Sequence, residues 1–295
     1  MRPGLAPLSD RLESMEQQIR AIAGRMDLLE ADAHKYESEL AYWRYLVKEG
    51  GSQKDFGAPF EEIFGRWQRN RLLKLGTFLG LPEPGQPGDV DDWCAARSVV
   101  EIGAGPYPAV AAAARGWKRC VAVDPIAKGY VEEGLLPRAA ESVVYIDAPG
   151  ERIPLPAGFA DLVVIENCLD HVTNPTTVLN EILRLLRPGG FLWLFVDLSD
   201  HCDHMHPHPM NEARIRGLMG SFNCVRDEVS NHKAHPEAYG GYRALYRKPE
   251  SARMRQESSG SAVQVRPSGL PGSGDSIENG TGIRLNGSAN GRPLP

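Results

Sequence analysis

Apolar residues recur every seven positions over residues 8–47, in two rows that are offset by three and four positions. This alternating spacing is typical of a coiled coil. One row is Leu12, Ile19, Met26, Ala33, Leu40 and Val47, and the other is Leu8, Met15, Ile22, Leu29, Tyr36 and Trp43. We therefore predict an N-terminal coiled-coil helix over residues 1–50 and a homodimer formed through residues 8–47. The alternative is a long helix that packs against its own globular domain.

Residues 51–95 are predicted to form a helical cap and a linker. Gly50, Gly51 and Ser52 end the first helix, because glycine interrupts helical patterns. Residues 56–80 have the apolar spacing of one or two short amphipathic helices, and residues 82–93 are rich in turn formers. We interpret the cations of this segment as a solvated face rather than an anion site: Arg66, Arg69, Arg71 and Lys74.

Strands and helices alternate over residues 96–249. The predicted strands are residues 98–102, 119–123, 142–146, 160–165 and 190–196, and the predicted helices are residues 108–115, 126–134 and 175–186. Continuous apolar strands separated by helices indicate an α/β fold with a parallel sheet that is covered on both faces. Residues 222–230 and 241–247 are read as two strands without a helix between them, which predicts an antiparallel end to the sheet.

Composition narrows the class of protein. The net charge of −5 argues against an extended phosphate-binding surface, and so against nucleic acid as the main partner. No apolar run approaches the roughly 18–20 residues that span a bilayer, so no membrane partner is expected. The first residues lack an apolar signal-peptide core and the five cysteines form no CxxC motif, which together predict a cytoplasmic protein. Residues 250–295 are rich in Gly, Ser and Pro without an aromatic residue, and we predict that they are disordered.

A glycine-rich turn follows the first predicted strand. Glu101, Gly103 and Gly105 end that strand and lead into a predicted helix, where a turn of this kind lets the backbone approach a ligand. Pro106 and Pro108 lack the N–H donors that a pyrophosphate would use. The turn therefore favours a nucleoside-like ligand without a phosphate bridge, and disfavours a nicotinamide oxidoreductase.

Acidic residues also end the next two predicted strands. Asp124 lies 21 residues after Gly103, a spacing at which a carboxylate can accept both ribose hydroxyls. Asp147 follows the third strand. Because the carboxyl ends of parallel strands line one crevice, these groups and Glu101 suit a ligand with positive charge and exposed N–H or O–H donors. S-adenosylmethionine meets that description.

The ordered series of motifs resembles the class I S-adenosylmethionine-dependent methyltransferases. The resemblance covers about residues 97–197 and includes DLVVIENCLDHV at residues 161–172 and LRPGG at residues 186–190, which are similar to the small-molecule branch of the family. It implies a Rossmann-like sheet of seven strands with an antiparallel last strand. It also implies a cofactor site in which Glu101, Gly103 and Gly105 contact the methionine half, Asp124 the ribose, Asp147 and Ala148 the adenine, and Glu166 and Asn167 lie under the sulfonium. Trp67, Gln68 and Arg71 precede the first strand and are candidate lid residues.

Histidines at two places in the sequence are candidates for binding or deprotonating the methyl acceptor. His171 follows the fourth strand and is either a general base or part of a helix cap. Four further histidines crowd the segment after the fifth strand: His201, His204, His206 and His208. Acceptor recognition or general-base catalysis through His204 or His206 is one interpretation. Binding of a divalent metal by His204, His206 and His208, with Asp200 or Asp203, and a merely solvated loop are the others.

We therefore predict an S-adenosylmethionine-dependent methyltransferase that acts on an oxygen of a sugar or another hydroxylated small molecule. The predicted catalytic residues are His171, His204 and His206; no metal ligand is assigned, although a divalent metal stays possible. The alternatives are a C- or N-methyltransferase, and a non-catalytic scaffold in which the coiled coil recruits partners.

Overall fold

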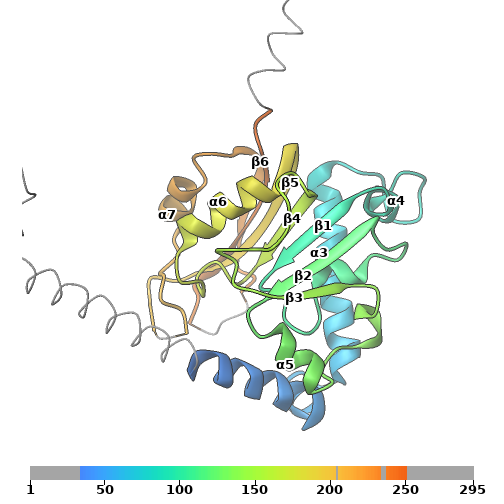
Figure 1. Ribbon diagram of the computed structural model, residues 1–295, viewed down its shortest axis with the longest axis vertical. Coiled ribbons are helices and arrows are strands. Elements are labelled where there is room, and N and C mark those ends of the chain that lie inside the picture. Colours follow the sequence, from blue (N-terminus) through green and yellow to red (C-terminus); the bar gives the residue numbers. More distant parts are fainter. Residues whose placement is uncertain (1–33, 204, 234–236, 251–295) are drawn as a thin grey trace, which may run out of the picture. The chain divides into compact units, whose positions relative to one another are not determined.

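The computed structural model describes residues 34–203, 205–233 and 237–250, and its centre is a seven-stranded sheet (Figure 1). The strand order is β3-β2-β1-β4-β5-β7-β6. Five strands are parallel: β1 (Ser98–Ile102), β2 (Arg119–Asp124), β3 (Val144–Asp147), β4 (Ala160–Glu166) and β5 (Leu186–Leu198). Strand β7 (Gly240–Arg247) runs antiparallel to β5, and β6 (Asn223–Ser230) runs antiparallel to β7. The predicted α/β fold with an antiparallel end is confirmed.

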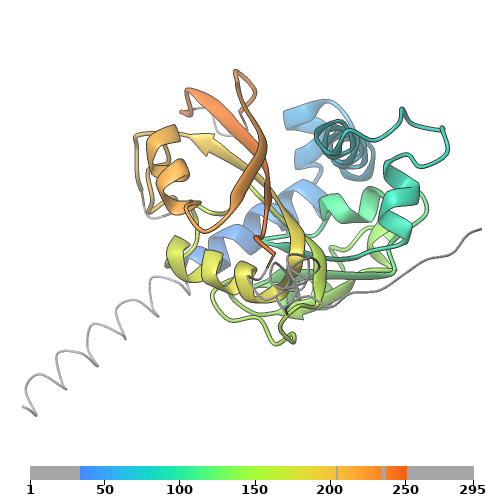
Figure 2. The ribbon, with the colours of Figure 1, turned by 90° about the horizontal axis from the view of Figure 1, so that it is seen from above.

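Apolar side chains on both faces of the sheet bury it between two layers. Along β4, Val163 and Ile165 belong to one core, whereas Leu162 and Val164 belong to the other, as expected when successive side chains point to opposite faces. Helices α6 (Pro175–Leu185) and α7 (Glu212–Leu218) cover the first face, and α3 (Phe60–Leu79) and α4 (Val90–Ala95) cover the second (Figure 2). Both faces of the central strands are therefore buried under helices. A ligand can reach the sheet only at the ends of its strands, and we expect it at the carboxyl ends.

The glycine-rich turn leads into a single 3-10 turn, η1 (Ala109–Ala112), and not into the helix predicted over residues 108–115. In an α-helix the N–H of Ala114 would donate to the carbonyl of Val110. Instead the Ala114 N–H donates to Asp91 Oδ1 at 2.8 Å, and the Val110 carbonyl accepts from Trp117 Nε1 at 2.8 Å. Tertiary hydrogen bonds thus end the helix despite the run of alanines.

Short helices complete the domain. Helix α2 (Gly51–Phe56) precedes α3, α5 (Ala127–Glu132) follows β2, and η2 (Arg138–Ala140) precedes β3. Helix α4 occupies the end of the predicted linker, because the side chain of Asp89 accepts the backbone N–H groups of Asp91 and Asp92 and so caps it. Helix α7 was not predicted from the sequence. Among the described residues, no helix has both the length and the apolar character that crossing a membrane requires.

The cations of α3 form ion pairs, so their interpretation as a solvated face is wrong for most of them. Arg69 pairs with Asp91 at 2.6 Å, and Lys74 pairs with Glu228 of β6 at 2.9 Å. Arg71 Nε lies 3.0 Å from Glu166 at the end of β4. Only Arg66, which is 3.9 Å from Glu62 on its own helix, keeps an exposed position. These pairs connect α3 to the sheet.

Residues 34–48 are helical, and their apolar rows pack on the same chain. Tyr36, Leu40, Trp43 and Val47 contact a buried cluster formed by Ile126, Tyr130 and Leu135. Arg44 donates two hydrogen bonds to Glu133, and this ion pair joins the helix to the end of α5. For this segment the structure agrees with the alternative, a helix on its own domain. Residues 1–33 and 251–295 lie outside the described residues, so the coiled coil, the homodimer and the disordered tail stay predictions.

Candidate active site

The glycine turn after β1 is held between the end of β4 and the helix over residues 34–48. Gly103 and Gly105 have φ angles of 65° and 60°, which favour glycine. A Cβ atom on Gly103 would lie 2.3 Å from the sulfur of Cys168, and one on Gly105 would lie 3.1 Å from the indole of Trp43. Both glycines are therefore required by backbone conformation and by close packing.

Asp124 is fixed beside this turn at the end of β2. Its carboxylate accepts the backbone N–H of Gly105 at 3.0 Å and that of Ile126 at 3.1 Å, and the hydroxyl of Tyr130 lies 3.4 Å away. Only 5% of the residue is exposed. Burial raises the pKa of Asp124 to about 6, although the two backbone hydrogen bonds favour the charged form. The predicted ribose-binding carboxylate thus lies against the glycine turn.

The two residues predicted to lie at the adenine, Asp147 at the end of β3 and Ala148 directly after it, are next to Asp124. Asp147 pairs with Asp124 in the sheet register, is exposed, and accepts the backbone N–H of Lys128 at 3.1 Å. Ala148 is buried, and its N–H donates to the Asp124 carbonyl at 3.3 Å. The glycine turn, Asp124 and Asp147 therefore lie together at the carboxyl edge of the sheet, as the sequence predicted.

Glu101, at the end of β1, is hydrogen-bonded to the first residues of η1. Its two carboxylate oxygens accept the N–H groups of Ala109 and Val110 at 3.0 and 2.9 Å. Burial raises the pKa of Glu101 to about 8. Its contacts stabilise the shape of the turn, while its predicted contact with the methionine half of a cofactor stays a prediction.

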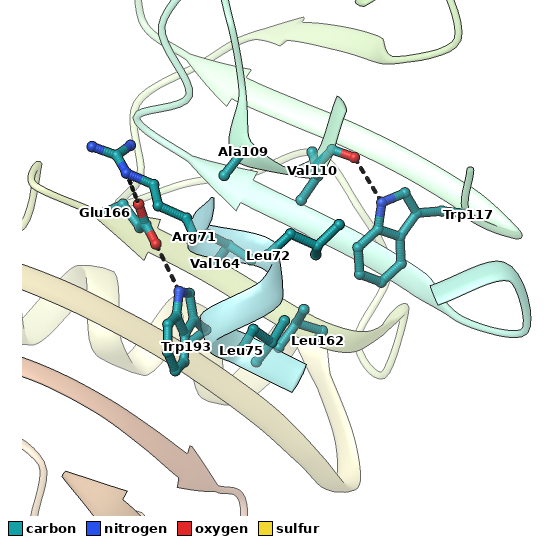
Figure 3. A pocket seen from close by; sticks show the side chains of 10 residues that line it. All are labelled: Arg71, Leu72, Leu75, Ala109, Val110, Trp117, Leu162, Val164, Glu166 and Trp193. Atoms are coloured by element: carbon teal, nitrogen blue, oxygen red, sulfur yellow. Dashed lines mark hydrogen bonds and ion pairs between the residues drawn. The ribbon is translucent and has the colours of Figure 1, made fainter. Parts of the chain in front are cut away.

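Glu166 is engaged on the α3 side of the sheet. Its carboxylate accepts a hydrogen bond from Trp193 Nε1 of β5 at 2.7 Å and forms the ion pair with Arg71 of α3 (Figure 3). The three side chains lie at one end of a small pocket under α3 whose other lining residues are Leu72, Leu75, Ala109, Val110, Trp117, Leu162 and Val164 (Figure 3). These apolar walls suit helix packing. Oε1 of Glu166 accepts the hydrogen bond from Trp193, and Oε2 forms the ion pair with Arg71 but accepts no hydrogen bond among the described residues. The contacts of Glu166 thus give no support to its predicted place under a sulfonium.

Asn167, the next residue, turns the chain out of β4. It is the one non-glycine residue with a positive φ, 52°, among the described residues. Its side-chain oxygen accepts the backbone N–H of Asp197 at 3.2 Å, and its own N–H donates to the Phe195 carbonyl at 2.8 Å. Asparagine tolerates this conformation well. Asn167 therefore sets the direction in which the chain leaves β4, toward Asp170 and His171.

The structure brings together two of the three predicted catalytic histidines. The rings of His171 and His206 are 4.3 Å apart between centroids, and Asp170 lies beside them with its Oδ2 3.8 Å from His171 Nε2. His204 lies outside the described residues. His206 and His208 line the same pocket but have different partners. Nε2 of His208 lies 2.9 Å from the Val172 carbonyl, whereas Nδ1 of His206 lies 3.1 Å from Asp203 Oδ1.

Acidic groups surround the histidine pair. His206 Nδ1 is 3.1 Å from Asp203 Oδ1, and burial and the neighbouring His171 lower the pKa of His206. Burial by itself would raise the pKa of Asp203, but the backbone N–H groups of His206 and Met205 lower it to about 2. The pocket next to this pair is lined by Asp170, Asp197, Ser199, His201, Asp203, His206, His208, Met210, Glu237 and Ala238. Most of these residues are polar or charged, and they come from the ends of β4 and β5 and the segments that follow them.

The helix over residues 34–48 extends from the histidine pair to the glycine turn, which sequence reasoning missed. Lys35 Nζ donates to the His171 carbonyl, and Glu39 Oε1 lies 3.6 Å from His171 Nδ1. Further along, Leu40 contacts Gly129 and Trp43 contacts Gly105. A signal was available in the sequence: Lys35 and Glu39, four residues apart, add a polar pair beside the apolar rows.

Comparison with known proteins agrees with this architecture. Residues 100–194 match the family model described as "Methyltransferase domain". An uncharacterized methyltransferase of Mycobacterium tuberculosis is 31% identical over 139 residues, which are 45% of this chain and 56% of that protein. Another, from a Mycobacterium species (strain JLS), is 34% identical over 94 residues, 32% of this chain and 36% of that protein. The chain thus spans about half the length, or less, of these curated relatives.

A solved structure shows the same fold. The N-methyltransferase NodS from Bradyrhizobium japonicum, in complex with S-adenosylhomocysteine, aligns with a TM-score of 0.50 and 20% identity, over 73% of this chain and 99% of that one. The matched segment, the strand order and the glycine turn together identify a class I S-adenosylmethionine-dependent methyltransferase domain in this chain.

Proposed function

We propose that this protein transfers a methyl group from S-adenosylmethionine to an oxygen of a sugar or another hydroxylated small molecule. The observation that carries the proposal is the placement of His171, His206 and Asp170 at the carboxyl ends of β4 and β5, on the same sheet edge as the glycine turn and Asp124. Methyl transfer is an in-line displacement, so the donor site and the acceptor site must be neighbours.

The donor half of the site fits S-adenosylmethionine. Asp124 offers a buried carboxylate to ribose hydroxyls. The turn at Gly103 and Gly105 carries no side chain of its own, although Cys168 and Trp43 pack against it. When bound, the cofactor supplies an electrophilic methyl group on its sulfonium. The indole of Trp43 packs against Gly105. We therefore expect that the helix over residues 34–48 shifts when the cofactor binds, or that the Trp43 indole stacks on the cofactor.

The acceptor half is polar, which favours a hydroxylated acceptor over a flat apolar one. A hydroxyl acceptor gains about 10²–10⁴-fold in rate when a positioned group removes its proton. The ring nitrogens of His171 and His206, beside the carboxylate of Asp170, are such groups. The walls add Asp197, Ser199 and Glu237, which can accept hydrogen bonds from further hydroxyls.

Two measurements test the proposal. Calorimetry of the full chain with S-adenosylmethionine and S-adenosylhomocysteine is expected to show micromolar binding. Transfer of isotopically labelled methyl groups to panels of sugars, phenols, amines and carbon acids then identifies the atom that is methylated, and we expect oxygen.

Each result has a clear consequence. Binding without transfer to oxygen, but with transfer to an amine or a carbon acid, would replace the proposal with N- or C-methylation. A folded protein that binds neither ligand would favour the non-catalytic scaffold. His171→Ala is expected to reduce transfer at least 100-fold with little change in affinity for S-adenosylhomocysteine. His232→Ala, which changes an exposed histidine outside the residues that line the pocket, serves as the control.

A further inference from the structure

The group formed by Asp170, His171 and His206 has the composition of a metal site. Each residue offers one ligand atom, and these three atoms lie within 4.8 Å of one another. Asp170 and His171 come from the segment after β4, whereas His206 comes from the segment after β5, so two separate parts of the chain converge here. Two imidazoles and one carboxylate are a recurrent ligand set for zinc and for other first-row transition ions, which keep one position open for water or substrate.

Buried polar atoms without partners mark the same place. Asp170 is 7% exposed, and its Oδ1 has no hydrogen-bond partner among the described residues. The Nε2 atom of His171 is likewise buried and without a hydrogen-bond partner there. An unsatisfied buried carboxylate oxygen costs free energy, because it loses its hydration without gaining a partner. A cation bound between these atoms would satisfy both.

Carboxylates lie on the outer side of both rings. Asp203 Oδ1 is 3.1 Å from Nδ1 of His206, and Glu39 Oε1 is 3.6 Å from Nδ1 of His171. Metal-binding histidines usually donate their second ring N–H to a carboxylate, which fixes the tautomer and makes the other nitrogen the ligand. A proton on Nδ1 of each ring makes Nε2 the ligand nitrogen in both.

We propose that Asp170, His171 and His206 bind one first-row transition-metal ion, of the Zn²⁺ or Co²⁺ kind, in preference to Mg²⁺. Nitrogen ligands disfavour Mg²⁺, which prefers oxygen and retains several waters. Only the catalytic use of the ion, and not its binding, rests on the proposed function. With the ion bound, His171 and His206 would act as ligands rather than as bases, and the ion would instead bind an acceptor hydroxyl and lower its pKa.

The test is metal binding by the full chain after treatment with a chelator and removal of that chelator. Titration with Zn²⁺ by calorimetry is expected to give one equivalent bound with a Kd in the micromolar range or below, and Co²⁺ is expected to give visible absorption bands. His206→Ala, His171→Ala and Asp170→Asn should each weaken Zn²⁺ binding at least 10-fold. Millimolar Mg²⁺ should not displace Zn²⁺.

Control variants separate this site from adventitious binding. Cys202→Ser and His232→Ala change exposed ligand-type residues that are not part of the cluster, and are expected to leave the affinity unchanged. The proposal is overturned if His206→Ala binds Zn²⁺ like the unmodified protein, or if the two control variants lose as much affinity as His206→Ala does. Circular dichroism confirms that each variant is folded. Binding of S-adenosylhomocysteine is measured in parallel, so failure of the donor site and failure of the metal site are distinguishable.

Discussion

Replacing Asp124 by Asn should change how the stability of the protein depends on pH. The carboxyl is buried at the end of β2, and its pKa is raised from 3.8 to about 6. A carboxyl whose pKa is higher in the folded than in the unfolded state binds protons more tightly when folded. Its contribution to stability is therefore fully present below pH 3.8 and is lost as the pH rises through 6. The unliganded protein is thus penalised at neutral pH for keeping a carboxylate where the ribose is expected.

The size of the effect follows from the two pKa values. A shift from 3.8 to about 6 corresponds to about 3 kcal/mol once the pH is well above 6. About half of this falls between about pH 5 and about pH 7.5. Asn cannot ionise, so its free energy of unfolding lacks this dependence. It also offers one acceptor oxygen to the N–H groups of Gly105 and Ile126, which costs about 1–3 kcal/mol at every pH.

The assay is urea unfolding of the unmodified protein and of Asp124→Asn at several pH values. The free energy of unfolding of the variant minus that of the unmodified protein should rise by about 1 kcal/mol from about pH 5 to about pH 7.5. Tyr130→Phe is a test of sign: it removes a hydroxyl that favours the charged carboxyl, so the midpoint of the pH dependence should move up. A difference between the two proteins that does not vary with pH would refute the reasoning.

Three further changes probe the neighbouring contacts. Arg71→Met should lower the free energy of unfolding by about 3 kcal/mol because it leaves the buried Glu166 carboxylate without its cation, and adding Glu166→Gln should recover most of the loss in urea unfolding. Gly103→Ala should destabilise by at least about 1 kcal/mol more than Gly134→Ala, since both have positive φ but only the first also meets a side chain; equal thermal shifts would contradict this. Trp43→Phe should abolish a change in tryptophan emission on titration with S-adenosylhomocysteine, and a signal that persists would place the responsible indole elsewhere.

The sheet could be predicted because each strand is a short apolar run with its own turn signals. Residues 98–102 and 241–247 were located to within one residue. The η1 segment shows the limit of such reasoning, since four consecutive alanines have a high helix propensity. The N–H of Ala114 donates to Asp91, which is distant in sequence, and the carbonyl of Val110 accepts from Trp117, which belongs to the following turn. Local propensity does not contain that information.

The carboxyl-edge groups were predictable from topology, whereas side-chain direction was not. Gly105, Asp124 and Asp147 had to meet because parallel strands end on one edge. The direction of Glu166 depends on its parity with Leu162 and Val164, which face α3. A strand that is buried on both faces has apolar residues at nearly every position and shows no alternation of apolar and polar residues. The sequence therefore does not reveal which face of the sheet a carboxylate at its end lies on.

The helix over residues 34–48 carries a further consequence for the predicted homodimer. One apolar stripe cannot contact its own domain and a partner helix at the same time. Tyr36, Leu40 and Trp43 already bury that stripe against Tyr130 and its neighbours. Dimerisation through residues 34–47 would therefore expose both the stripe and the cluster under it, and would remove Trp43 from Gly105. A coiled coil confined to residues 8–33 would carry no such cost. A coiled coil that uses the apolar stripe up to residue 47 would have to remove Trp43 from the glycine turn.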